Sequence, residues 1–198
     1  MKCRYCRENR HHTEEMILIS DKQGEDHPLD PQSPYGASKL AGDRLCFAYS
    51  QTFPEMNICV VRNFNTFGEY QRDDSYGGVI AKFVKMAFRD EPLTLYGDGT
   101  QRRDYMHVKD AVSAYMLART LEGTYNFGTG KPIGIRWLAE RIIRMTGSRS
   151  KIVVTKPRRG EVYWLEADIK KARNVGFKPE TNFWKDLKKY IEWVRESA

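Results

Sequence analysis

Compact apolar runs alternate with stretches of helical periodicity along most of the chain. The runs "MILIS" (16–20) and "NICVVR" (57–62) are typical of buried strands. Further strands are predicted at "LTLYG" (93–97), "TYNFGTG" (124–130) and "KIVV" (151–154). Between these strands, turn-rich segments such as "DKQGEDHPLDPQSP", "NFNTFGEYQRDDSYGG", "DGTQRRD" and "TKPRRGE" predict loops.

The segments between the strands carry signals for helices. Ser33 is a good N-cap and Pro34 a good first helical residue, so a helix is predicted from Pro34 to about Thr52. The apolar pattern predicts further helices over 79–89, 108–121, 135–146, 168–174 and 182–196. Strands and helices that alternate at this spacing indicate an α/β fold with parallel strands.

The first 15 residues differ from the rest of the chain. Residues 1–15 have no apolar periodicity and form a polar, basic leader. We expect residues 16–198 to form one domain, because 198 residues suffice for one core and no long linker interrupts them.

Composition favours an intracellular protein. No apolar run approaches the ~20 residues of a membrane span, and the N-terminus does not resemble a signal peptide. The cysteines are Cys3, Cys6, Cys46 and Cys59; we expect Cys46 in a helix and Cys59 in a strand, both as buried thiols. This set does not form a disulfide framework, so we expect a reducing, cytoplasmic location and no membrane partner.

The net charge of +7 and the pI near 9.2 favour an anionic ligand, either nucleic acid or a sugar nucleotide. Basic residues recur at 2–10, 102–103 and 149–159 instead of forming one tail. That distribution favours a small anion held from several loops. The leader has no interleaved aromatic residues on which bases could stack, so we do not expect nucleic acid as a partner.

The segment "SPYGASKL" places Tyr35 four residues before Lys39. On a helix these residues share a face, and the ammonium group of Lys39 would favour the phenolate form of Tyr35. Such a tyrosine can take a proton from a substrate hydroxyl while hydride leaves the same carbon. The alternative is a tyrosine and a lysine on a helix surface without a joint role, since this spacing also arises by chance.

The surrounding residues make the functional interpretation stronger. "HPLDPQSPYGASKLAGDRL" resembles the active-site helix of the extended short-chain dehydrogenase/reductase family, the NAD-dependent nucleotide-sugar epimerases and 4,6-dehydratases. The likeness continues in "VVRNFNTFGEYQR", "LYGDGTQRRDYMHVKDAVSAY", "TYNFGTG" and "KPRRGEVYWLEADIKKARNVGFKPET". These segments follow the family's order and cover about residues 16–197.

The resemblance implies roles at the matching positions. Tyr35 would be the catalytic base, and Lys39 would be its partner and would also bind the cofactor ribose. Ser20 would hydrogen-bond the reacting hydroxyl. Asn65 would contact the nucleotide sugar, and Arg103 and Arg158 would hold its diphosphate, where a guanidinium can bond two oxygens at once. The base could be uracil, thymine or guanine, as in UDP-, dTDP- or GDP-linked sugars.

The chain also departs from the family pattern. The family begins with a strand, a Gly-x-x-Gly-x-x-Gly turn and a helix whose N-terminus meets the NAD pyrophosphate, and this chain has no such stretch. We therefore expect an incomplete Rossmann-like parallel sheet: residues 16–68 would be its remnant, and 69–198 mainly the small substrate-binding region. Where 4,6-dehydratases carry an Asp-Glu pair, this chain has Asp21 and Lys22, so it lacks the glutamate of standard dehydratase chemistry, whereas an epimerase needs only hydride transfer out and back with the tyrosine. The sequence does not decide between the two reactions.

These departures leave several functions open. The first is an epimerase/dehydratase acting at sugar C4, with activity that is impaired or needs another chain for the adenosine-binding part of the NAD site. The second is a non-catalytic module that binds nucleotide sugars. Apolar faces and sheet edges that the missing part would cover should drive homodimer formation or strand exchange.

The leader offers a third, weaker possibility. Cys3, Cys6, His11 and His12 could bind zinc, but the gap between Cys6 and His11 is short and adjacent histidines rarely share one metal. We therefore assign no metal site and interpret the leader as a basic segment without a fold.

Overall fold

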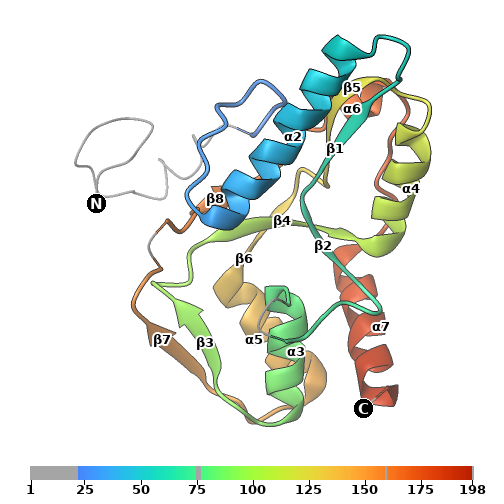
Figure 1. Cartoon of the computed structure of the whole chain (residues 1–198). Coiled ribbons are helices and arrows are strands. Elements are labelled where there is room, and N and C mark those ends of the chain that lie inside the picture. The colour runs from blue at the N-terminus through green and yellow to red at the C-terminus, as the bar shows by residue number, and fades with distance from the viewer. Residues whose placement is uncertain (1–21, 75–76, 159, 198) are drawn as a thin grey trace.

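The computed structural model describes residues 22–74, 77–158 and 160–197. In Figure 1 the strand β4 (Arg102–His107) crosses the middle of the molecule. On one side of it lie α2 (Pro34–Thr52), β1 (Cys59–Asn63), α4 (Val108–Ala118), β5 (Gly123–Phe127) and α6 (Lys170–Asn174). On the other lie α3 (Val79–Phe88), β3 (Leu93–Tyr96), α5 (Ile135–Thr146), β7 (Ile152–Thr155) and α7 (Phe183–Glu196).

The strands β1 and β5 are parallel, in register from Cys59 opposite Gly123 to Asn63 opposite Phe127. Helix α4 covers one face of this pair, where Ala111 and Ala114 pack in a core that Val61 also contacts. Helix α2 lies on the other side of β1 (Figure 1). The pair therefore has the layered arrangement of a doubly wound α/β sheet.

Strand β4 organises the rest of the sheet structure. It pairs with β2 (Asn65–Phe67) and β8 (Trp164–Leu165) in parallel, and with β6 (Pro132–Gly134) in the antiparallel direction. Strands β3 and β7 form a separate parallel pair. Beneath β4, the helices α3, α5 and α7 enclose the larger core, whose most deeply buried members include Val84, Leu93, Leu138, Ile142 and Leu187.

Helix α2 begins as the sequence predicts. Ser33 is extended, and its hydroxyl accepts a hydrogen bond from the Gly36 amide at 3.1 Å, with Pro34 as the first helical residue. No side chain of this helix is buried. One charged contact joins it to the sheet: Arg62 Nε on β1 donates to Asp43 Oδ2 at 2.7 Å, and the same guanidinium donates to the Glu25 carbonyl.

The carboxylate of Asp104 on β4 is completely buried and lies where three segments meet. It accepts hydrogen bonds from the amides of Thr129 (3.0 Å), Gly130 (2.7 Å) and Ala167 (3.1 Å), and from the Thr129 hydroxyl. A buried carboxylate is stable only when donors replace its hydration. At Gly128 an added Cβ would lie 2.7 Å from the Ala167 Cβ and 3.0 Å from Asp104 Oδ2, so only glycine fits without displacement there.

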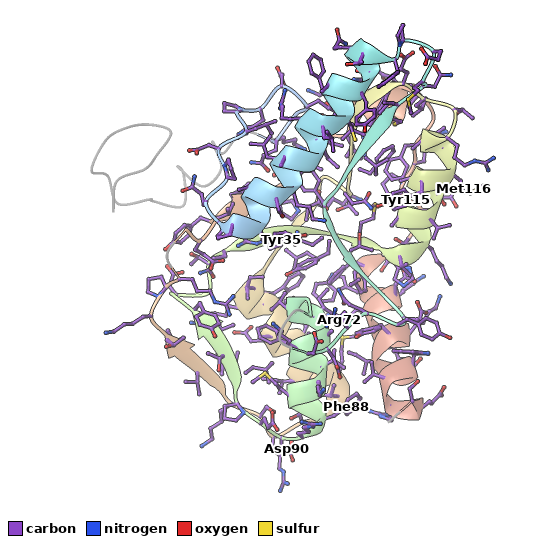
Figure 2. All side chains as sticks on the ribbon, in the orientation of Figure 1. Tyr35, Arg72, Phe88, Asp90, Tyr115 and Met116 are labelled. Carbon is purple, nitrogen blue, oxygen red and sulfur yellow. The ribbon has the colours of Figure 1, made fainter. Side chains whose placement is uncertain are left out.

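Apolar side chains are exposed on both helices that flank β1. On α2, Leu45 is 59% exposed and Phe47 57%. On α4, Tyr115 is 54% exposed and Met116 55%, and Figure 2 shows both on the outer part of that helix. Apolar side chains are thus exposed on the helices on both sides of β1.

Several predictions differ from the structure. The segment predicted as a loop after "NICVVR" contains β2, and the segment "DGTQRRD" contains the start of β4. The short strands β6 and β8 were not predicted. Cys46 and Cys59 lie in a helix and a strand as expected, but each is only partly buried; burial still raises the pKa of Cys59, which Lys171 opposes. The predicted strand 16–20 and the leader lie outside the described residues.

The Asp104→Asn variant should lose stability. The amide group keeps the shape of the side chain but presents an N–H group to the amides that Asp104 accepts from, so buried donors lose their acceptor. We expect the free energy of unfolding to fall by about 2–4 kcal/mol in urea titrations followed by circular dichroism. The control is Asp73→Asn, because Asp73 is 52% exposed and pairs with Lys85 on the surface; its loss should stay below about 1 kcal/mol. Equal losses in both variants would contradict this account of Asp104.

Candidate functional site

Tyr35 and Lys39 lie together at the N-terminal end of α2. The ammonium nitrogen of Lys39 is 5.4 Å from the centroid of the Tyr35 ring, and the Tyr35 side chain is 72% exposed. Figure 2 shows Tyr35 at the first turn of the helix. The helix therefore places a phenol and an ammonium group side by side on an open face, as the spacing predicts.

A shallow cavity of about 310 Å³ lies beside this pair. It is formed by the loop 28–31, by Gly36, Lys39, Leu40 and Asp43 of α2, and by Arg62 of β1. The ion pair between Asp43 and Arg62 forms part of its wall. Lys39 therefore borders both the Tyr35 ring and a cavity that could hold one end of a ligand.

Arg103 on β4 is mostly buried, with 16% of its side chain exposed. It donates to Glu161 Oε1 at 2.7 Å and to the carbonyl of Arg102 at 2.9 Å. Burial lowers the pKa of the Arg103 guanidinium, and the carboxylate of Glu161 opposes this by favouring the charge. A fixed, partly desolvated guanidinium of this kind is suited to a phosphate group.

Arg158 is exposed, and its guanidinium carbon stacks 3.6 Å from the centroid of the Tyr96 ring at the end of β3. The Glu161 amide donates to the Arg158 carbonyl at 3.3 Å, so both arginines contact the same loop. Stacking leaves the edge of the guanidinium free to donate hydrogen bonds.

The loop that carries Arg158 also touches the segment that precedes α2. Gly160 has φ of +73°, and an added Cβ there would lie 2.8 Å from the carbonyl oxygen of Gln32. Glycine is therefore required both by the backbone angle and by the close approach. This contact places the phosphate-binding candidates next to the start of the helix that carries Tyr35.

Asn65 on β2 lies opposite Tyr105 on β4, and its side-chain amide donates to the carbonyl of Asp104 at 3.0 Å. The side chain is thus held one residue away from Arg103. Since β2 directly follows β1, this register connects the β1–β5 pair to the strand that carries Arg103.

The structure brings most of the predicted site residues together in two groups. Tyr35 and Lys39 form one, and Arg103, Arg158 and Asn65 belong to the other, which the contact between Gly160 and Gln32 joins to the first. Ser20 lies outside the described residues, as do Cys3, Cys6, His11 and His12.

Three supporting residues were not predicted: Glu161, Tyr96 and Asp104. Each lies inside a motif noted in the sequence, "PRRGE", "LYGDG" or "QRRDY". Only Asp104 carried a local signal, as a charged residue directly beside the candidate Arg103. Their partners, however, could be identified only from the fold.

The residues present fit one end of a nicotinamide dinucleotide better than the other. Lys39 borders Tyr35 and the cavity beside it, as a ribose ligand must. By contrast, no Gly-x-x-Gly-x-x-Gly turn for a pyrophosphate occurs in the sequence. Within the described ranges, no helix has the length and apolar character needed to span a membrane, and no cluster of three metal-ligating side chains is found.

Comparison with known proteins agrees with this geometry. The family model described as the NAD dependent epimerase/dehydratase family matches residues 13–128. A curated relative, the putative UDP-glucose 4-epimerase of Methanocaldococcus jannaschii, is 33% identical over 87% of this chain and 57% of its own length. The UDP-glucuronate 4-epimerase of Thermodesulfobacterium geofontis is 31% identical over 87% and 54%. The chain thus spans just over half the length of these relatives.

Solved structures give the same result. The UDP-glucose 4-epimerase of Thermus thermophilus, in complex with NAD, superposes with a TM-score of 0.84 at 28% identity over 91% of this chain and 60% of that one. The UDP-glucose 4-epimerase of Thermotoga maritima, with UDP-glucose, gives 0.79 at 30% identity over 85% and 55%. The likeness confirms a Rossmann-like α/β fold over part of those structures. Because the family model covers more than half of the sequence, this chain belongs to the NAD-dependent epimerase/dehydratase family.

Proposed function

We propose that the protein acts on a nucleotide sugar at the sugar C4 position in an NAD-dependent epimerase or dehydratase reaction, with activity that is impaired or needs another chain. One observation carries the proposal. The Tyr35–Lys39 pair lies on a helix whose preceding segment packs, at Gln32, against the loop that holds Arg158 and meets Arg103 through Glu161. In this proposal the contact joins the proton acceptor, Tyr35, to the arginines that would hold the diphosphate.

In this proposal Tyr35 accepts the proton of the C4 hydroxyl through its phenolate oxygen. The ammonium group of Lys39 stabilises that phenolate and hydrogen-bonds a ribose hydroxyl, and Ser20 orients the substrate hydroxyl. NAD, when bound, supplies the hydride acceptor for the C4 hydrogen. For epimerisation, Tyr35 returns its proton to the C4 oxygen once the sugar has presented its other face.

Arg103 and Arg158 would hold the diphosphate, and Asn65 would contact the nucleotide sugar beside it. Arg103 already lies in a partly desolvated position where ion pairing is stronger than in water. The diphosphate would share Arg103 with Glu161. The relatives from Thermotoga maritima and Thermus thermophilus, whose structures contain UDP-glucose and NAD respectively, support this class of substrate and cofactor. Loop side chains would select the base. UDP-glucose is the first substrate to test, because the Thermotoga maritima structure contains it.

Lys22 favours epimerase over dehydratase chemistry within this proposal. It stands where the dehydratases carry a glutamate, and its ammonium group pairs with Glu166 Oε1 at 2.8 Å. A lysine engaged in this way cannot serve as the carboxylate acid or base that water elimination requires.

A non-catalytic nucleotide-sugar-binding module is the second candidate. It is favoured by the lack of a Gly-x-x-Gly-x-x-Gly turn in the sequence given. Asn65, Arg103 and Arg158 are all described residues, and each is held by a neighbour: Asn65 by the Asp104 carbonyl, Arg103 by the Glu161 carboxylate and Arg158 by the Glu161 amide.

Assembly with a second chain, as a homodimer or a strand-exchanged oligomer, is part of this proposal. Apolar side chains are exposed on both α2 and α4, among them Leu45, Phe47, Tyr115 and Met116. Exposed apolar surface of this kind supports association.

Binding and turnover separate the two functions. We expect native mass spectrometry to show uptake of UDP-glucose and of NAD, and proton NMR to show slow conversion at C4. Tyr35→Phe should lower turnover at least about 100-fold while leaving UDP-glucose uptake unchanged, because it removes only the proton acceptor. The matched control is Tyr115→Phe, an exposed tyrosine on α4. Uptake of UDP-glucose without any uptake of NAD would instead establish the binding module.

Removing the charges of Arg103 and Arg158 tests whether these arginines hold the diphosphate. Arg103→Ala and Arg158→Ala should each weaken UDP-glucose binding about 10-fold or more in isothermal titration calorimetry, because each loses a charge-assisted hydrogen bond to the diphosphate. Arg149→Ala, which removes an arginine whose side chain is 90% exposed, serves as the control. If all three variants bind UDP-glucose equally well, Arg103 and Arg158 do not hold the diphosphate.

The oligomeric state tests whether the exposed apolar residues of α2 and α4 form an interface. The wild-type chain should be a dimer in light scattering, and Leu45→Glu on α2 should shift it toward the monomer, because a buried charge without a partner destabilises an interface. Met116→Glu on α4 shows whether the second face takes part. A wild-type chain that stays monomeric and fully folded would contradict the association.

A further inference from the structure

A second, larger cavity of about 630 Å³ lies between β4, β6 and the start of α7. None of Tyr35, Lys39, Asn65, Arg103 and Arg158 lines it. Its size is that of a small-molecule site, and apolar and aromatic side chains line it together with polar and basic ones. It is therefore distinct from the candidate site.

The charged residues that line this cavity are all basic. Lys131 comes from the β5–β6 loop, Arg173 from α6 and Lys178 from the segment that precedes α7, and no aspartate or glutamate lines the cavity. Within the described part of the chain none of the three has an ion-pair partner, unlike Lys22 or Lys85. Three unneutralised cations from three segments favour an anion.

The walls of the cavity are aromatic. Phe67, Tyr105, Phe183 and Trp184 line it, and the rings of Phe67 and Phe183 lie 5.1 Å apart. Tyr105 is 4% exposed, and its hydroxyl has no hydrogen-bond partner among the described residues. Burial raises the pKa of Tyr105, which keeps the phenol neutral and able to donate. A buried donor without an acceptor is costly unless something else satisfies it.

The segment that carries Lys178 is held firmly at the cavity. The buried carboxylate of Asp110 accepts hydrogen bonds from the amides of Glu180 (3.0 Å) and Thr181 (3.3 Å). Asn182 then caps α7, a helix of 14 residues, by accepting from the Lys185 amide. The N-terminal end of this helix therefore faces the cavity with its positive dipole end.

We propose that this cavity is a second binding site for a small organic phosphate that carries an aromatic group. The phosphate binds to Lys131, Arg173 and Lys178 at the rim, and the aromatic group packs against the rings of Phe183 and Trp184. A mononucleotide has this chemistry. The inference does not rest on the proposed enzymatic function, because it uses none of the residues of that site.

The probe for this site is phenyl phosphate, titrated into uniformly ¹⁵N-labelled protein, with inorganic phosphate and phenol as separate arms. We expect the indole N–H signal of Trp184, identified by its loss in Trp184→Phe, to shift and saturate below about 10 mM. Inorganic phosphate and phenol alone should bind at least fivefold more weakly, because each makes only part of the contacts.

Charge removal gives the decisive comparison. Lys131→Ala, Arg173→Ala and Lys178→Ala should each raise the dissociation constant several-fold, and the triple variant should raise it at least 30-fold. Lys151→Ala, an exposed lysine that does not line the cavity, and Arg103→Ala should leave it within twofold. The proposal is overturned if the triple variant binds within twofold of wild type, if inorganic phosphate binds as tightly as phenyl phosphate, or if the Trp184 signal does not move.

Discussion

The buried carboxylate of Asp104 is the constraint on which the arrangement of this protein depends. Removed from water, it needs donors, and it finds them in the turn after β5 and in the segment after β8. These segments lie 25 and 63 residues further along the chain. The same residue offers its backbone carbonyl to Asn65. One residue therefore fixes the end of the sheet remnant, the glycine turn and a candidate substrate ligand relative to β4.

The candidate site follows from that constraint. Arg103 is the neighbour of Asp104 in sequence and points to the other face of β4, where Glu161 holds its guanidinium. Because β4 is fixed by Asp104, the position of Arg103 is determined by the core instead of by a surface loop. By contrast, Tyr35 and Lys39 lie on a helix with no buried side chain, joined to the sheet through Arg62 and Asp43. The two halves of the site thus differ in how firmly they are held.

Much of the fold could be predicted from local signals. Ser33 and Pro34 mark the start of α2, and compact apolar runs mark β1, β3, β5 and β7. The strands that were missed are short or polar: β6 and β8 have three and two residues. The sequence of β4, "RRDYMH", carries charges because two of its residues bind other segments, so its pattern is not that of an apolar strand. The Tyr35–Lys39 pair could be predicted because helical spacing is local. The partnership of Arg103 with Glu161 could not, since it joins residues 58 positions apart.

The close packing of Gly160 against Gln32 has a consequence for how the site would respond to a ligand. A loop that tightens on a diphosphate cannot shift there without pressing on the backbone just ahead of the helix that carries the phenol. If the proposed function holds, binding at one end of the site would therefore press on the other end across this contact. Only glycine at position 160 permits this close contact, because any side chain there would push the loop away from Gln32.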